Sequence, residues 1–294
     1  MESWLLFVFV IINILVAKDN KGIVVGSDNN DEVSFEEHYE VMYGDDHVVL
    51  PSDRANQLQL SMDNSSGSGF GSKMTYGSGF FHMRIKVPGG DTSGVVTAYY
   101  LSSHGDHHDE IDYEFLGNKE GGPHTLQTNI YVDGNGGREQ RLHLWFDPSQ
   151  GFHNYSILFN QHQIVFFVDR VPIRVYKNKT DIGAGYPTKA MRIEATLWDG
   201  NNWATNGGKS KVNWDYAPFQ ASFKDFGVRG CEVQTFSSSS NLQDCFSDRF
   251  SWNRQKFWQL DPTRQTLYEN VQKTYVTYDY CDDSPRFSTR PKEC

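Results

Sequence analysis

The stretch HHDEIDYEFLGN, residues 107–118, alternates acidic and apolar side chains through its centre. On an extended chain, successive side chains point to opposite faces of the sheet. One face would carry Ile111, Tyr113 and Phe115. The other face would carry Glu110, Asp112 and Glu114. The stretch therefore predicts a strand with a core face and an acidic face.

The same period of two dominates residues 33–225. In residues 124–132 (HTLQTNIYV), apolar Leu126, Ile130 and Val132 oppose Gln127, Asn129 and Tyr131, and residues 191–199 (MRIEATLWD) alternate likewise. Turn-forming clusters of Gly, Pro, Asn and Asp separate these segments, and no fixed repeat appears. The pattern predicts an all-β fold of two antiparallel sheets packed face to face. Helical patterns are scarce, and the best candidate helix lies at residues 264–273.

The composition narrows the function classes. The chain has 294 residues, 38% of them hydrophobic, which suits one large sandwich domain or two small ones. A net charge of −10 argues against nucleic-acid binding, which needs a basic face. The acidity itself indicates no more than solubility.

The amino terminus carries an apolar run at residues 5–16, interrupted by Asn13. This run is shorter than the ~20 residues that span a bilayer but fits a secretory signal peptide. Glu2 and Leu15 depart from the usual signal pattern, and a buried strand is the alternative. We expect a signal peptide at about residues 1–17, a secreted protein, and no membrane segment after cleavage.

The four cysteines all lie in the last quarter of the chain and allow three pairings. Proximity favours Cys231–Cys245 and Cys281–Cys294, and no CxxC spacing supports a zinc site. A secreted chain also exposes its sequons to glycosylation. The candidates are Asn64, Asn154 and Asn178.

Glu110 and Glu114 suit carbohydrate chemistry. Their α-carbons would lie ~13 Å apart on a strand, and inward-leaning side chains would bring the carboxyls to roughly 5–6 Å. Retaining glycosidases need two carboxyls about 5–5.5 Å apart, one as nucleophile and one as general acid. Asp112, between them, would raise the pKa of a neighbouring acid by like-charge repulsion. On spacing alone, a solvated acidic face, a calcium site, or a metal site at His104, Asp106, His107 and His108 remain alternatives.

The residues themselves narrow the choice. HDEIDYEFLGN closely resembles the signature of plant xyloglucan endotransglucosylase/hydrolases, in glycoside hydrolase family 16. Further matching segments, in order, are SGSGFGSK (66–73), VVTAYYLSS (95–103), LQTNIYVDG (126–134), REQRLHLWFDP (138–148), TLWDGNNWAT (196–205) and YDYCDDSPRF (278–287). The resemblance implies a concave jelly-roll catalytic domain, at residues 18–225, and a disulfide-stapled extension at residues 226–294.

The resemblance also implies residue roles. Glu110 would be the nucleophile, Glu114 the general acid/base, and Asp112 the residue that orients and tunes the nucleophile. The implied sugar-binding residues are Gln127, Asn129, Arg138, Glu139, Asn202, Trp203, Gly207 and Arg286. Trp198 is either a wall of the substrate cleft or a packing residue.

Three positions depart from the family pattern. Gly137 replaces an asparagine of a sugar-binding segment, and Asn202 replaces a common aspartate. After FLGN the family commonly carries a sequon, whereas this chain continues Asn118-Lys119-Glu120, which excludes that glycan.

The resemblance predicts a cell-wall (apoplastic) enzyme that cleaves a xyloglucan donor and transfers it to a xyloglucan acceptor. Hydrolysis-dominated members carry a longer loop near the cleft, and residues 177–191 show no insertion, which favours transfer over hydrolysis. A non-catalytic glucan-binding module is the competing class, but a pure binder has no use for all three carboxylates. A structural wall protein would need low-complexity repeats. No metal or organic cofactor is expected, and the expected state is a monomer.

Overall fold

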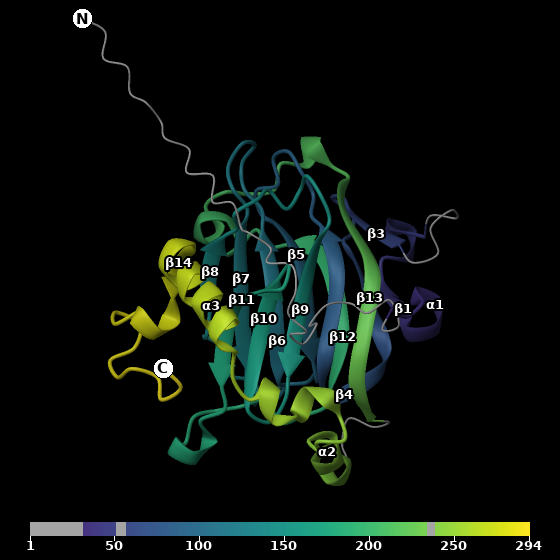
Figure 1. Cartoon of the computed structure of the whole chain (residues 1–294). Coiled ribbons are helices and arrows are strands. Elements are labelled where there is room, and N and C mark those ends of the chain that lie inside the picture. Colours follow the sequence, from purple (N-terminus) through teal and green to yellow (C-terminus); the bar gives the residue numbers. More distant parts are fainter. Residues whose placement is uncertain (1–31, 51–56, 234–238) are drawn as a thin grey trace, which may run out of the picture.

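The computed structural model describes residues 32–50, 57–233 and 239–294, so the predicted signal peptide lies outside the described residues. Antiparallel strands dominate, as the alternation predicts, and the all-β expectation is confirmed. Figure 1 shows the strands stacked in layers, with the helices at the periphery. The strands are β1 (Tyr39–Tyr43), β2 (Val48–Val49), β3 (Gln57–Met62), β4 (Ser68–Lys86), β5 (Val95–Ser102), β6 (Glu110–Leu116), β7 (Thr125–Tyr131), β8 (Gln140–His143), β9 (His153–Phe159), β10 (Gln163–Val168), β11 (Val171–Lys177), β12 (Met191–Asp199), β13 (Phe219–Val233) and β14 (Val276–Asp279). The helices are α1 (Phe35–His38), α2 (Ser239–Cys245) and α3 (Pro262–Thr274).

Strand β4 connects the two layers of the sandwich. Its first part, up to Tyr76, pairs with β12 and β1. From Gly79 onward it pairs with β9, and its other edge there pairs with β13. The change from β12 to β9 falls at Gly77–Ser78, and on the other edge β13 already pairs with β4 from Thr75. Strand β4 there passes from one sheet to the other, as corner strands of sandwiches do.

The sheet of interest runs β4–β12–β5–β6–β7–β8–β14. The other layer runs β11–β10–β9–β4, with β13 and β3 beyond. The core lies between the layers and is rich in aromatic rings. Tyr113 and Phe115 of β6 pack edge-on against Tyr155 of β9, with ring centroids 5.8 and 4.8 Å apart. These contacts bury one face of β6 and leave its acidic face pointing away from the core.

The buried Tyr113 hydroxyl has hydrogen-bond acceptors within reach. The backbone carbonyls of Ser156 and Phe167 lie 3.0 and 2.8 Å from its oxygen, and its single hydrogen is donated to one or shared between them. A buried hydroxyl without such partners would be costly. These bonds fix the height of β6 above the opposite sheet.

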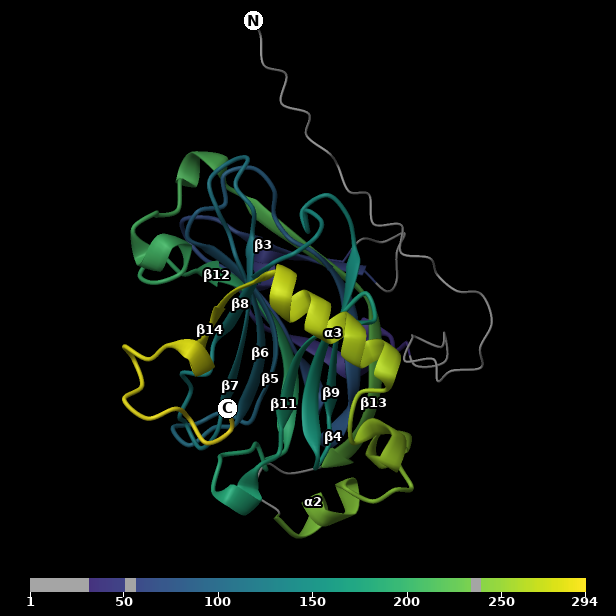
Figure 2. The same cartoon turned by 60° about the vertical axis from the view of Figure 1, so that its left-hand side comes forward.

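The carboxyl-terminal part contains the predicted helix. Helix α3 begins after Asp261, whose side chain accepts a hydrogen bond from the Arg264 amide, with Pro262 at its first position. It packs against β11, and Figure 2 shows it lying across the outer layer of strands. The chain then returns as β14, which adds to the edge of β8.

Both predicted disulfides, Cys231–Cys245 and Cys281–Cys294, are confirmed. The first joins β13 to α2, and both its cysteines are buried in a small cluster with Trp252. The predicted domain boundary at residues 225/226 lies inside β13, and Phe226 is fully buried in the main core. The sandwich and the carboxyl-terminal extension thus share strand β13.

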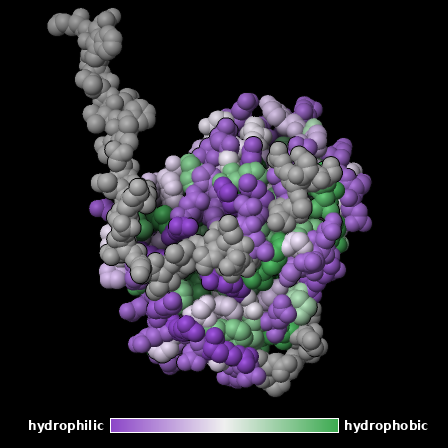
Figure 3. Space-filling model, turned by 45° about the vertical axis from the view of Figure 1, so that its right-hand side comes forward, coloured by the Kyte–Doolittle hydropathy of each residue, from purple (hydrophilic) through white to green (hydrophobic). Residues whose placement is uncertain are grey.

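On the face shown in Figure 3, hydrophilic residues predominate and apolar residues form separate patches. In the described ranges, no helix has the length and apolarity needed to span a bilayer.

Candidate active site

The three acids predicted on β6 lie on one face of the sheet. In the antiparallel register, Glu110 is opposite Ser102 of β5 and Tyr131 of β7. Directly opposed residues point to the same face. We call this surface, formed by the side chains of β12, β5, β6, β7 and β8 that share the orientation of the acids, the carboxylate face. On this face, the residues opposite Asp112 and Glu114 are Tyr100, Ala98, Asn129 and Gln127.

Glu114 is held by two successive hydrogen bonds. Gln127 Nε2 donates to Glu114 Oε2 at 2.6 Å, and Arg141 Nε donates to Gln127 Oε1 at 2.7 Å. Burial, together with the charges of Glu110 and Glu139, raises the pKa of Glu114 to about 7 against the opposing effect of the Gln127 bond. A carboxyl with this pKa is able to give and take a proton near neutral pH.

Asp112 is the most deeply buried acid of the three, at 5% exposure. Burial first, and then the charges of Glu110 and Glu114, raise the pKa of Asp112 well above its ordinary value. The raised pKa of Asp112 favours its protonated form as the donor in the hydrogen bond that it shares with Glu110. Its Oδ1 atom finds no hydrogen-bond partner among the described residues.

Glu110 receives this bond as the acceptor. Burial raises the pKa of Glu110, and hydrogen bonds from Ser102 and Asp112 work against that rise. A carboxylate stabilised by donors, beside a neutral acid, suits attack on an electron-poor carbon. The arrangement gives adjacent acids different protonation states, which two-carboxylate chemistry requires.

Asn129 is buried opposite Asp112 in the strand register. Its side-chain oxygen accepts from the backbone amides of Ile130 and Arg138, at 2.9 and 3.0 Å. With the oxygen occupied, the NH2 group is what Asn129 can offer to a neighbour or a sugar.

Glu139 and Arg286, far apart in sequence, form an ion pair. Arg286 Nη1 lies 2.6 Å from Glu139 Oε2, and it also donates to the Tyr278 hydroxyl at 3.3 Å. Tyr278 is opposite Arg141 in the β8–β14 register, and the Arg141 guanidinium stacks over its ring at 5.1 Å. The extension thereby continues the carboxylate face beyond Gln127.

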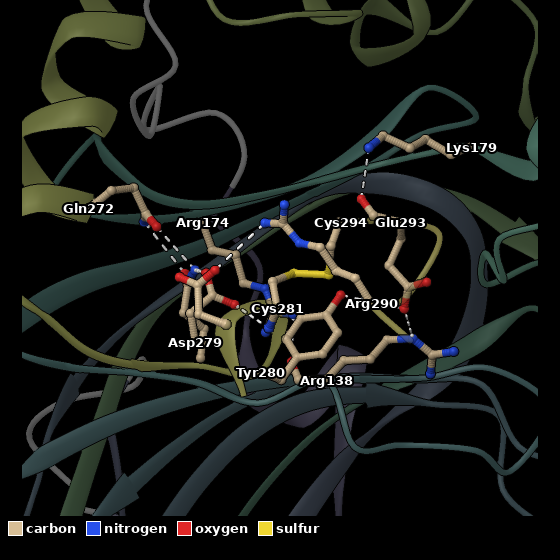
Figure 4. Close-up of a disulfide and its surroundings, with 12 residues drawn as sticks. Arg138, Arg174, Lys179, Gln272, Asp279, Tyr280, Cys281, Arg290, Glu293 and Cys294 are labelled. Carbon is tan, nitrogen blue, oxygen red and sulfur yellow. Dashed lines mark hydrogen bonds and ion pairs between the residues drawn. A yellow bond between two sulfur atoms is a disulfide. The ribbon is translucent and has the colours of Figure 1, made fainter. Parts of the chain in front are cut away.

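Arg138 forms an ion pair with the carboxyl-terminal extension. Its Nε lies 2.7 Å from Glu293 Oε1, and its Nη1 donates to the carbonyls of Ile130 and Asn135. Figure 4 shows Arg138 directed at Glu293 beside the Cys281–Cys294 disulfide. A sugar contact by Arg138 stays a prediction, but the structure gives this guanidinium a local partner.

The tryptophans form a second feature of this face. Trp198 and Trp203 lie with ring centroids 6.0 Å apart, packed on Val96 and Leu116. Trp198 shares the orientation of Glu194 and is half-buried, so it both packs and lines the carboxylate face. The predicted residues Asn202 and Gly207 are exposed in the loop that carries Trp203, and Gly207 has a φ of 65°.

Two family models match this chain. The model described as "Glycosyl hydrolases family 16" matches residues 35–216, and "Xyloglucan endo-transglycosylase (XET) C-terminus" matches residues 247–294. "Xyloglucan endotransglucosylase/hydrolase protein 2" of Arabidopsis thaliana is 53% identical over 262 residues, 89% of each chain. The chain belongs to the xyloglucan endotransglucosylase/hydrolase family. "Xyloglucan endotransglucosylase/hydrolase protein 3" of the same plant is 51% identical, again over 89% of each chain.

Solved structures agree on the fold. A Bacillus licheniformis β-glucanase superposes with a TM-score of 0.55 at 21% identity, covering 66% of this chain and 92% of its own. The apo Crh5 transglycosylase gives 0.57 at 21% identity, covering 72% and 87%. The predicted jelly-roll sandwich and family membership are confirmed, and the chain is a glycoside hydrolase/transglycosylase of this family.

Sequence reasoning did not assign Arg141, Glu194 or His104 to this family enzyme's carboxylate face, and it considered His104 only as a metal ligand. Arg141 stands in the quoted REQR segment but was not singled out. From β8, it donates the hydrogen bond to the Gln127 side-chain oxygen. Glu194 alternates onto the polar side of its strand, and His104 follows the end of β5. Strand register, which a single sequence does not give, brings these residues together.

The structure shows the surroundings of Asn118 and of the three candidate glycosylation sites. Asn118, followed by Lys119, donates from its side chain to the Pro123 carbonyl at 3.0 Å. Of the remaining sequons, Asn64 is exposed in the turn between β3 and β4, whereas Asn178 Nδ2 donates to the Gln161 carbonyl at 2.7 Å. Asn154 accepts from Ser156 Oγ at 2.8 Å. Occupancy of any of the three stays a prediction.

Proposed function

We propose that this family enzyme is a secreted, monomeric xyloglucan endotransglucosylase of the cell wall and apoplast. It cleaves the β-1,4-glucan backbone of a xyloglucan donor and joins the donor fragment to a xyloglucan polymer or oligosaccharide. The observation that carries the proposal is the set of three acids on one face of β6, with Asp112 buried between Glu110 and Glu114 and Glu114 hydrogen-bonded by Gln127.

The reaction proceeds in two displacements. In the first, a Glu110 oxygen attacks the anomeric carbon while the bond to the leaving oxygen breaks. Glu114 gives its proton to that oxygen, and the donor fragment remains as an ester of Glu110. Asp112 holds Glu110 through its hydrogen bond and keeps the negative charge on the attacking group.

In the second displacement, a hydroxyl of the acceptor attacks the same carbon. Glu114, now a carboxylate, takes the proton of that hydroxyl, and the ester bond to Glu110 breaks. The configuration at the anomeric carbon is retained because it is inverted twice. The Glu114 pKa near neutrality suits a group that must act first as acid and then as base.

Transfer competes with hydrolysis by water at about 55 M, and oriented binding of an acceptor can outweigh that concentration. The acceptor is held on the Glu114 side, by the Trp203 loop and by the extension around Arg286. Gln127 and Asn129 contribute amide hydrogen bonds to sugar hydroxyls. The alternative, a predominantly hydrolytic enzyme, uses the same acids. The connection at residues 178–190 is short and contains one 3-10 turn, and the lack of an inserted loop there supports transfer over hydrolysis.

The test is incubation of the purified protein with polymeric xyloglucan and a labelled xyloglucan oligosaccharide, with Glu110→Ala as control. Label entering polymer without new reducing ends supports the transglucosylase. Reducing ends without incorporation make the protein a hydrolase. Binding without either product, equal in wild type and variant, leaves a glucan-binding module.

A further inference from the structure

A fourth carboxyl lies on the carboxylate face and has no role in the two displacements. Glu194 of β12 is opposite Tyr100 of β5, which is in turn opposite Asp112 of β6. Its side chain is 1% exposed. A buried carboxylate is costly unless other groups pair with it, so its partners indicate its use.

The partner of Glu194 is a histidine that follows β5. His104 Nε2 lies 2.6 Å from Glu194 Oε1. His104 has a φ of 58°, a left-handed conformation that is uncommon for residues other than glycine. This turn brings the imidazole back over the sheet, where the buried carboxylate holds it, while its side chain stays 51% exposed. An anchored ring is thus presented on an accessible surface.

Tyr100 reinforces the same carboxylate. Burial first, and then the charge of Glu194 and a hydrogen bond with it, raise the pKa of the Tyr100 hydroxyl. Glu194 therefore interacts with Tyr100 on the sheet and with His104 above it. Its charge also acts on Glu110, which places the group close to the nucleophile.

The direction of the reaction tells which sugar would meet this pair. Glu114 protonates the leaving oxygen, so the acceptor side begins at Glu114. The donor sugar sits over Glu110 and extends away from Glu114 along the face. His104 follows Ser102, the residue opposite Glu110, and its ring is held by Glu194 of β12. It therefore lies on the side of β6 away from β7, β8 and the extension, which we take as the donor side.

We propose that His104, anchored by Glu194, is a donor-side binding contact that hydrogen-bonds hydroxyl groups of the β-1,4-glucan. The inference rests on the proposed function and deepens it by giving the donor half of the substrate a recognition element. Sugar hydroxyls both donate and accept, and an imidazole held by a carboxylate offers a fixed polar edge to them.

The test compares His104→Ala, His104→Gln and Glu194→Gln with wild type in the labelled-transfer assay. The donor polymer is varied at saturating acceptor, and then the acceptor is varied at saturating donor. Loss of one hydrogen bond of about 1.4 kcal/mol corresponds to a tenfold change. We expect His104→Ala to raise the donor KM about tenfold and to leave the acceptor KM within twofold. His104→Gln keeps part of the affinity, and Glu194→Gln loses it because the ring is no longer anchored.

His107→Ala is the matched control. It removes a histidine of the same loop whose side chain is 80% exposed and faces Asp133 instead of Glu194. Its two KM values should equal those of wild type. Melting curves identify any variant that unfolds, and His104→Ala, at a half-exposed position, keeps the test valid if Glu194→Gln does not fold.

An unchanged donor KM in His104→Ala, or an equal rise in the acceptor KM, overturns the inference and leaves the proposed function intact. A wild-type protein silent in both products overturns the proposed function instead. In that case, affinity for a xyloglucan oligosaccharide is compared between Glu110→Ala and Glu110→Ala/His104→Ala. Equal affinities there overturn the contact, and a tenfold loss supports it.

Discussion

Gln127 donates a 2.6 Å hydrogen bond to Glu114 while its own oxygen is held by Arg141 at 2.7 Å. An amide side chain is ambiguous about which end it presents, and the guanidinium removes that ambiguity because it can only donate. Arg141 is thus a positioning residue for the acid, acting through Gln127. The Arg141 stack on Tyr278 extends the relationship into the carboxyl-terminal extension.

Replacing Arg141 with Leu should lower kcat about 10- to 100-fold, because Glu114 loses the orientation and hydrogen bond that general acid catalysis needs. The Gln127 bond and the Arg141 charge both lower the pKa of Glu114, so the basic limb of the pH profile should move upward from about 7. Arg141→Lys should restore part of the rate. A rate loss with an unmoved basic limb would show that Arg141 serves folding alone.

Asp112→Asn should separate stability from activity. A carboxyl whose folded pKa is raised destabilises the fold as pH rises above its unfolded value of about 3.9. The amide cannot ionise, so we expect the variant to melt higher than wild type at pH 7, by about 2–4 °C for ~1 kcal/mol. Its transfer rate should fall, because the hydrogen-bonded proton beside Glu110 is replaced. A variant that melts lower than wild type would contradict the proton assignment.

His82 predicts an acid sensitivity of the whole fold. It is 3% exposed, and neither ring nitrogen has a hydrogen-bond partner among the described residues. Burial and the nearby Arg229 lower the pKa of His82 to about 4. A histidine with a depressed folded pKa binds its proton more readily when unfolded. Stability should therefore fall as pH drops from about 6.5 to about 4, by up to about 3 kcal/mol.

His82→Met removes this titration and should flatten the dependence of the melting temperature on pH across that window. Met suits the site because it adapts to irregular buried space. His107→Gln, at an exposed position, should keep the wild-type slope. An unaltered slope in His82→Met would assign the acid sensitivity to other groups, of which half-buried His124 is the next candidate.

Cys281→Ser/Cys294→Ser should weaken both fold and acceptor binding. The disulfide closes a loop of 13 residues, for which chain entropy predicts about 3 kcal/mol. Glu293, next to Cys294, pairs with Arg138, whose backbone amide holds Asn129. We expect a melting temperature about 6–12 °C lower and a higher acceptor KM. An unchanged acceptor KM would confine the disulfide to a structural role.

Sequence pattern was sufficient for the strand faces and for the acids. Alternation around Ile111 and Tyr113 predicts which side chains of β6 are buried, because the period of a strand is fixed by its geometry. The helix expected at residues 264–273 appears as Pro262–Thr274, two residues longer at its start and one at its end. Cysteine proximity was equally informative, since short loops are the least costly to close.

The partnerships across the sheet were beyond that reasoning. Arg138 meets Glu293 across 155 positions of sequence, and His104 meets Glu194 across 90. Such contacts depend on which strands are neighbours and in what register. The length of strand β4 was not predicted for a related reason. Its glycines interrupt the alternation at the point where the strand changes sheet.

The sharing of β4 between the sheets has a consequence for motion. A strand that is hydrogen-bonded into both layers cannot be released from one without loosening the other. Backbone amides along β4 should therefore exchange with solvent at the rate of global opening. The layer with Glu110, Asp112 and Glu114 is thus held in place through β4 by the opposite layer. Acceptor exchange must then rely on the loops and the extension, and the spacing of Glu110 and Glu114 stays constant while sugars come and go.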